Sequence, residues 1–194
     1  NLRAEGVADG VHVVGDVMLD ALMIVDGLGV RILSDLGLTQ GEYVFATVHR
    51  ASNTDDLSKL MSIMSALGSL GERVVLPKHP RTAAALERAG YVAAQNVSMI
   101  EPVGYGESIA LIGNARVVAT DSGGLQKEAF WLNTPCVTMR DQTEWTETLG
   151  AGWNIVVGAD TVRIVGAIKD ARAPDSHPPL YGEPGAAGRL VELL

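Results

Sequence analysis

The segment "ARVVATDSGGLQKEAF" (residues 115–130) decides the fold. It begins as a short β-branched run and stops at Asp121, after which Ser122, Gly123 and Gly124 lead into polar residues at helical spacing. This change of period predicts a buried strand that turns directly into a helix. Bare backbone N–H groups at the start of such a helix favour an anion. A tight turn capped by Asp121 or Ser122 would explain the same residues equally well.

The same alternation of strand-like and helix-like segments continues along the chain. It predicts a parallel β-sheet with helices on both faces, and six strands suggest the doubly wound, Rossmann-like order 3-2-1-4-5-6. Thr54 and Asp160 are plausible N-caps of the first and last helices. The expected strands are residues 42–48, 73–77, 96–100, 115–120, 135–139 and 154–158, and the expected helices lie near 54–70, 81–89, 106–113, 123–132, 143–150 and 160–170.

In that order the first and fourth strands are neighbours, and ligands bind beyond their carboxyl ends. The first strand ends in His49 and Arg50, and the fifth strand ends in Arg140, which could pair with Asp141 or Glu144 or face a phosphate. Glu128 lies one turn into the helix that follows Gly124, on the same face. Its carboxylate could hold the hydroxyls of a ribose, or it could be a solvated glutamate.

The two ends of the chain differ from the middle. We interpret residues 1–20, with the strand-like run "VHVVG" (11–15), as the tail of a missing preceding domain and its linker. Residues 21–172 form the expected Rossmann-like domain. Residues 173–194, rich in Pro and Gly, are interpreted as a surface crossing loop followed by a short helix in "GRLVELL". His177 in that loop is expected to be solvated.

Composition narrows the classes of function. The net charge of −8 argues against nonspecific nucleic-acid binding, and no apolar run approaches the roughly 20 residues that span a bilayer. The single cysteine, Cys136, cannot form an internal disulfide and is expected to be a buried, inert thiol. No secretory signal is visible, so a cytoplasmic location is the expectation. No Cys/His set has the spacing of a metal site, so we expect no structural zinc.

Three motifs resemble those of the UDP-N-acetylglucosamine 2-epimerases, which have the two-domain GT-B fold. They are "TVHRASN" (47–53), "TDSGGLQKEA" (120–129) and "RDQTEW" (140–145), with weaker support from "PVGY" (102–105) and "LYGEPGAAGR" (180–189). The resemblance implies the C-terminal, UDP-binding half of such an enzyme. It also implies a reaction in which UDP is eliminated across C1–C2 of the sugar and added back with the opposite configuration at C2, without a cofactor.

The resemblance also implies roles for individual residues. Ser122, Gly123 and Gly124 would hold the diphosphate, Glu128 would hold the ribose, and His49 would contact the diphosphate and take part in catalysis. The nucleotide-binding residues it implies are His49, Arg50, Tyr105, Ser122, Gly123, Gly124, Glu128 and Arg140. The implied ligand is UDP or a UDP-N-acetylhexosamine, and the implied protein partner is the missing N-terminal domain. The resemblance leaves open whether the full-length enzyme forms a homodimer.

Four residues depart from the family pattern. Ser52 replaces a usual Glu, Ser108 an aromatic residue beside the base, Lys127 a Glu, and Trp145 an Arg. The acids that the family uses at C2 lie in the N-terminal half. Three other readings therefore stay open: a hydrolysing epimerase that releases N-acetylmannosamine, the donor domain of a GT-B glycosyltransferase, and a non-catalytic nucleotide-binding module.

Overall fold

The computed structural model describes residues 2–194, and the chain divides into two compact units. The larger unit runs from Val25 to Pro178 and contains all six strands. The smaller unit joins the described residues up to Ile24 with Pro179–Leu194.

The larger unit is built on a parallel sheet with the strand order β3-β2-β1-β4-β5-β6, which confirms the predicted topology. The register places Thr47 of β1 beside Thr120 of β4, and Thr120 beside Thr138 of β5, so the carboxyl ends of the three central strands lie level. The strands are β1 Tyr43–Thr47, β2 Arg73–Pro77, β3 Val97–Ile100, β4 Val117–Thr120, β5 Cys136–Thr138 and β6 Asn154–Val156.

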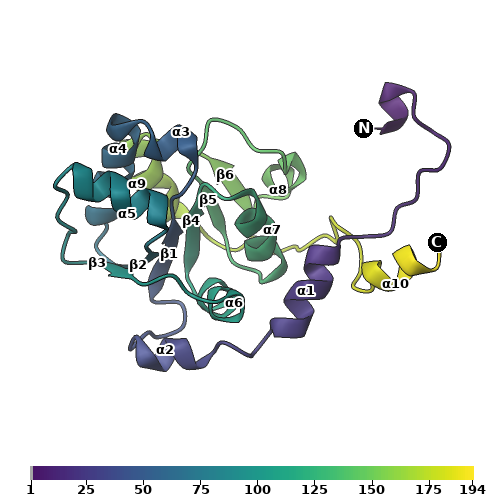
Figure 1. Cartoon of the computed structure of the whole chain (residues 1–194), viewed down its shortest axis with the longest axis horizontal. Coiled ribbons are helices and arrows are strands. Elements are labelled where there is room, and N and C mark those ends of the chain that lie inside the picture. The colour runs from purple at the N-terminus through teal and green to yellow at the C-terminus, as the bar shows by residue number, and fades with distance from the viewer. Residues whose placement is uncertain (1) are drawn as a thin grey trace. The chain divides into compact units, whose positions relative to one another are not determined.

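Helices cover both faces of this sheet (Figure 1). One face packs against α4, α5 and α9, while α6 and α7 lie on the other. The helices of the larger unit are α2 Arg31–Asp35, α3 Ala51–Thr54, α4 Leu57–Gly68, α5 Pro80–Arg88, α6 Tyr105–Gly113, α7 Gly123–Trp131, α8 Thr146–Gly150 and α9 Thr161–Asp170.

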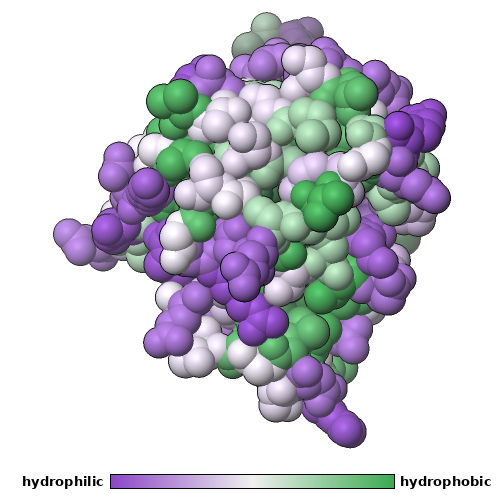
Figure 2. Space-filling model, turned by 90° about the vertical axis from the view of Figure 1, so that its left-hand side faces the viewer, coloured by the Kyte–Doolittle hydropathy of each residue, from purple (hydrophilic) through white to green (hydrophobic). Residues whose placement is uncertain are grey.

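The strands are apolar on both sides because both faces are covered. On β1, Val44 and Ala46 face the core formed with α4 and α9, while the neighbouring Tyr43 and Phe45 are equally buried. A strand in such a position has a continuous apolar run, which is the pattern that residues 43–46 show. On the side that faces the viewer in Figure 2, hydrophilic residues surround smaller groups of hydrophobic ones.

Two local expectations needed correction, and a third was confirmed. Thr54 does not cap the first long helix: it ends the one-turn helix α3, and Asp56 caps α4 by accepting from the N–H of Lys59. Residues 11–15 form no strand, and the helix α1 (Val17–Val25) follows them. Asp160 caps α9 as predicted, through the N–H of Arg163.

The smaller unit is held together by contacts between the two ends of the chain. It contains the 3-10 helix η1 (Leu2–Glu5), most of α1 and α10 (Ala186–Val191). The carboxylate of Asp20 on α1 accepts hydrogen bonds from the N–H groups of Gly185 and Ala187 at 2.6 and 2.7 Å. Arg189 of α10 donates to the carbonyl of Val14. Val14 and Asp20 thus contact the C-terminal segment.

Candidate functional site

Asp121 joins the ends of β1 and β4. Its fully buried carboxylate accepts hydrogen bonds from the backbone N–H groups of His49, at 3.0 Å, and Arg50, at 2.9 Å. Asn53 adds a third donor at 3.1 Å and also donates to the carbonyl of Met139 beyond β5. Asp121 therefore does not cap α7; it fixes the loop after β1 against the loop after β4.

The first turn of α7 is open to a ligand. Ser122 is its N-cap, with a side-chain oxygen that accepts from the N–H of Leu125 at 3.4 Å. Residues 122–125 are half-buried, whereas residues 126–130 are buried. The capped turn and the anion site are compatible, because the cap engages one N–H and leaves the rest of the helix N-terminus available to an anion.

Positively charged side chains gather at this N-terminus. A Cβ added to Gly123 would lie 3.6 Å from a guanidinium nitrogen of Arg50 and 3.9 Å from Oε2 of Glu144. Arg140 pairs with Glu144 through two hydrogen bonds of 2.9 and 2.7 Å. Of the pairings left open for Arg140, the structure shows the one with Glu144.

Glu128 is buried, with only 5% of its surface exposed, so the reading of a solvated glutamate is wrong. Burial raises the pKa of Glu128, against the opposing effects of a hydrogen bond from Tyr105 and the charge of Lys127. Burial and the nearby Glu128 together raise the pKa of Tyr105 to about 12. The structure therefore brings together Glu128 of α7 and Tyr105, the first residue of α6.

His49 lies between this edge and a neighbouring cavity. Its Nδ1 is 3.4 Å from Oδ1 of Asp121, and its ring centroid is 5.2 Å from that of His79. Burial lowers the pKa of His49, and His79 and Arg50 act in the same direction, while Asp121 opposes them. The net shift favours the neutral imidazole.

The cavity beside His49 has a volume of about 180 Å³. Apolar side chains that follow β1, β2 and β3 line most of it, together with His79, Ser108 and Leu125. Ser108 is one of the departures from the family pattern, so this cavity contains a hydroxyl where the resemblance implies an aromatic ring. His79, an exposed residue, lines the same cavity.

Two other departures, Lys127 and Trp145, contact each other. The Nζ of Lys127, a residue only 5% exposed, lies 4.3 Å from the ring of Trp145 and 5.5 Å from that of Trp131. The indole N–H of Trp145 donates to the carbonyl of Gly123 at 2.8 Å. The segment 140–145 is thereby attached to the first turn of α7.

A buried polar network supports the same turn. Gln126 donates to the carbonyl of Ser122 and accepts from Thr143 and from Asn154 of β6. Asn154 in turn accepts from Thr138 of β5. Sequence reasoning did not connect these residues with one another, because their partners are on separate elements of the chain.

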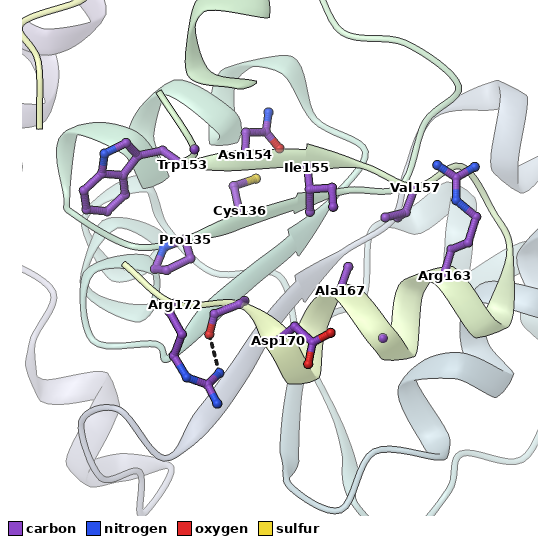
Figure 3. Close-up of a pocket in the computed structure, with 13 residues that line it drawn as sticks. Pro135, Cys136, Trp153, Asn154, Ile155, Val157, Arg163, Ala167, Asp170 and Arg172 are labelled. Carbon is purple, nitrogen blue, oxygen red and sulfur yellow. Dashed lines mark hydrogen bonds between the residues drawn. The ribbon is translucent and has the colours of Figure 1, made fainter. Parts of the chain in front are cut away.

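A second cavity, of about 500 Å³, lies between β6 and α9, and its lining includes neither Asp121 nor His49 (Figure 3). Arg163 and Arg172 stand at opposite ends of it, so their charges do not converge (Figure 3). Cys136 lines this cavity but is buried as predicted, and burial raises the pKa of its thiol to about 12. The cavity offers no arrangement of groups for catalysis.

Three further features concern metal binding, membrane spanning and the position of His177. Among residues 2–194, no group of three or more His, Cys, Asp or Glu side chains could hold a metal ion. Within the same range, no helix has the length and apolar character that crossing a bilayer requires. His177 is exposed but not simply solvated, because its ring stacks on Phe130 at 4.1 Å and its Nε2 lies 2.7 Å from the carbonyl of that residue.

Comparison with protein families gives one match over the whole chain. The family model described as UDP-N-acetylglucosamine 2-epimerase matches residues 1–194. A UDP-N-acetylglucosamine 2-epimerase homolog of Methanococcus maripaludis is 40% identical over 203 residues, which cover 100% of this chain and 57% of that protein. The UDP-2,3-diacetamido-2,3-dideoxy-D-glucuronate 2-epimerase of Pseudomonas aeruginosa is 43% identical, with 100% and 56% covered.

Solved structures of UDP-GlcNAc 2-epimerases also resemble this chain. The UDP-GlcNAc 2-epimerase of Methanocaldococcus jannaschii in complex with UDP-GlcNAc and UDP superposes with a TM-score of 0.83 at 29% identity, covering 99% of this chain and 57% of that one. The enzyme of Neisseria meningitidis bound to UDP-GlcNAc gives 0.81 at 26% identity, covering 98% and 57%. The chain therefore spans a little over half the length of its relatives and corresponds to one half of a GT-B epimerase fold.

Proposed function

The chain belongs to the UDP-N-acetylglucosamine 2-epimerase family, and on that premise we propose that it is the nucleotide-binding half of an enzyme that interconverts UDP-N-acetylglucosamine and UDP-N-acetylmannosamine. In the proposed reaction a base removes the proton at C2 while the bond from C1 to the UDP oxygen breaks. This gives UDP and an unsaturated sugar. UDP then adds back at C1, and a proton returns to the opposite face of C2.

The diphosphate is held at the N-terminus of α7. The observation that carries this proposal is the clamp of Asp121 on the backbone of His49 and Arg50, which fixes the Arg50 side chain beside Gly123. The guanidinium group, Arg140 and the helix N-terminus then provide positive charge from three separate segments. Such a set stabilises the negative charge that develops on UDP as it leaves.

The nucleoside extends from the diphosphate towards α6. Glu128, with Tyr105 beside it, binds the ribose hydroxyls, since a buried carboxylate with a single hydrogen-bond donor nearby retains acceptor capacity. The apolar cavity between His49, His79 and Ser108 takes the base. In the absence of an aromatic residue at position 108, apolar contacts replace stacking.

The ribose assignment can be tested with ligands that differ only in the nucleoside. Glu128→Ala should weaken UDP binding by about one to two factors of ten, because a hydrogen bond to a charged group contributes roughly 1.5–3 kcal/mol. Pyrophosphate, which has no ribose, should bind this variant as it binds the parent chain. Calorimetry that shows equal losses for both ligands would remove the ribose role.

His49 places its imidazole next to the diphosphate. Because Nδ1 lies 3.4 Å from Oδ1 of Asp121, Nε2 is the nitrogen left to face the ligand, and it contacts a phosphate oxygen as an N–H donor, since that oxygen can only accept. The acids that act at C2 belong to the part of the enzyme that this chain does not span. We therefore expect the chain alone to bind UDP weakly and to leave the C2 hydrogen in place.

A second substrate is favoured by one comparison. The relative from Pseudomonas aeruginosa, named for UDP-2,3-diacetamido-2,3-dideoxy-D-glucuronate, is 43% identical to this chain, whereas two relatives named UDP-N-acetylglucosamine 2-epimerase are 34% identical. A uronate substrate requires the same UDP site and the same chemistry at C2. The two substrates differ in groups on the sugar, which the other half of the enzyme is expected to contact.

A product assay of the full-length enzyme distinguishes these possible functions. Each UDP-sugar is supplied separately in deuterated water, and the products are followed by NMR. Epimer formation with deuterium at C2 supports an epimerase and identifies its substrate. Free N-acetylmannosamine indicates the hydrolysing subclass, and a sugar–acceptor conjugate indicates a glycosyltransferase. Binding of UDP without turnover of either substrate would contradict the proposed enzymatic function.

A further inference from the structure

An anionic side chain of the protein itself lies at the proposed diphosphate site. Oε2 of Glu144 is 3.9 Å from the position that a Cβ on Gly123 would take, and Gly123 is the first residue of α7. The hydrogen bonds from Arg140, with the charge of Arg50, lower the pKa of Glu144 to about 2. The carboxylate is therefore ionised throughout the range in which a UDP-sugar would bind.

The two members of the Arg140–Glu144 pair differ in exposure. The side chain of Arg140 is only 9% exposed, whereas that of Glu144 is 54% exposed. When a diphosphate arrives, Glu144 can turn towards solvent while Arg140 stays and pairs with the phosphate. The negative charge of Glu144 moves by the reach of one side chain, so it remains close to the bound diphosphate.

We propose that Glu144 is a specificity-determining residue: its negative charge makes the site discriminate against free nucleoside diphosphate in favour of the sugar-linked form. This inference rests on the proposed function, because it concerns the ligand of the same site. Glu144 lies in the segment 140–145, but the resemblance assigns it no role. The inference follows from the position of one carboxylate next to the N-terminus of α7.

The two forms of the ligand differ by about one charge. In a UDP-sugar both phosphates are esterified on two sides, so each carries a single negative charge. Free UDP has a terminal phosphate whose second ionisation has a pKa of about 6, so near pH 8 it carries roughly one charge more. Two unit charges about 6 Å apart in a well-hydrated site repel by an energy that corresponds to roughly three- to tenfold in affinity.

This discrimination suits the proposed chemistry. Free UDP is present in the site only after the C1–O bond has broken, and its extra charge disappears when UDP adds back to the sugar. The nearby carboxylate of Glu144 therefore weakens inhibition by UDP from solution, and Arg50, Arg140 and the helix N-terminus still hold the diphosphate of the substrate.

The test compares two ligands with three forms of the chain. Dissociation constants for UDP and UDP-N-acetylglucosamine are measured at pH 8 and low salt for the parent chain, Glu144→Gln and Glu147→Gln. Glu147, an exposed residue of α8, gives the same change in net charge without a bond to Arg140. Thermal melts verify that both variants are folded.

We expect Glu144→Gln to tighten UDP binding by about three- to tenfold more than it tightens UDP-N-acetylglucosamine binding. The control should change the ratio of the two constants by much less, and 0.5 M NaCl should reduce the effect by screening. An unchanged ratio, a ratio that moves as far in the control, or an effect that persists in high salt would overturn the inference alone. A parent chain that binds neither ligand would instead overturn the proposed function.

Discussion

The carboxylate of Asp121 holds the backbone of Arg50, whose N–H lies 2.9 Å from Oδ2. These two residues are 71 positions apart in the chain and follow neighbouring parallel strands, β4 and β1. The contact fixes the loop that carries His49 and Arg50 next to the first turn of α7. The aligned strand ends therefore form a site with defined positions of these residues.

The first prediction concerns this clamp. Asp121→Ala leaves two backbone N–H groups and the Asn53 amide without their acceptor, and each buried unsatisfied donor costs about 1–3 kcal/mol. We expect the free energy of unfolding to fall by about 2–5 kcal/mol in urea denaturation. Asp160→Ala, which removes only the cap of α9, should cost about 1 kcal/mol. Equal losses of unfolding free energy in the two variants would contradict the inference that Asp121 fixes the two loops.

A substitution at Gly123 distinguishes a purely structural turn from a ligand-binding site. An added Cβ would approach no other atom closer than 3.5 Å, so Gly123→Ala fits the unliganded chain. Because alanine suits a helix better than glycine does, stability should be unchanged or rise by up to about 1 kcal/mol. The methyl group would, however, occupy the space in front of the helix N-terminus. We expect calorimetry to show UDP affinity reduced about tenfold or more; retained affinity would place the diphosphate elsewhere.

Glu128 should make stability depend on pH in a specific direction. Its pKa is raised in the folded chain above the ordinary value of 4.5, so the ionised form opposes folding. Below pH 4.5 the carboxyl is protonated in both states and this cost is absent, whereas it grows as pH rises through the folded pKa. Glu128→Gln should therefore gain stability relative to the parent chain between pH 4.5 and pH 8. A difference that stays constant or shrinks over this range would contradict the burial of a charged Glu128.

Lys127 and Trp145 should be energetically coupled. In a double-mutant cycle with Lys127→Met and Trp145→Leu, removing both partners should cost less than the sum of the single losses. The expected coupling is about 0.5–2 kcal/mol, the range for a cation over an aromatic ring. Chemical denaturation of the four chains measures it. A coupling indistinguishable from zero would mean that these two departures from the family pattern are independent.

The central strands could be predicted because they are buried on both faces. Segments 43–46 and 117–119 are apolar throughout, and polar residues follow them. The short helices α2 and α3 could not be predicted in this way, since a helix of four or five residues shows little periodicity. Thr54 was assigned as a cap for the same reason: α3 separates it from the helix that Asp56 caps.

The candidate site was predictable in its location but not in its contacts. The carboxyl ends of β1, β4 and β5 meet at one edge, which follows from topology. That Arg140 pairs with Glu144 was one of the alternatives that their spacing of four residues allowed. That Glu128 is buried and that Lys127 lies against Trp145 depend on side chains from different elements. Spacing along the chain carries no information about such pairs.

The most direct test of the account is an NMR titration of the isotopically labelled chain with UDP, followed residue by residue through the backbone N–H signals. The account predicts that the largest changes occur at Gly123, Gly124 and Leu125, with further changes at His49 and Arg50. The contradicting result would be a titration that leaves these signals unchanged, or one in which the changes are concentrated around the cavity between β6 and α9.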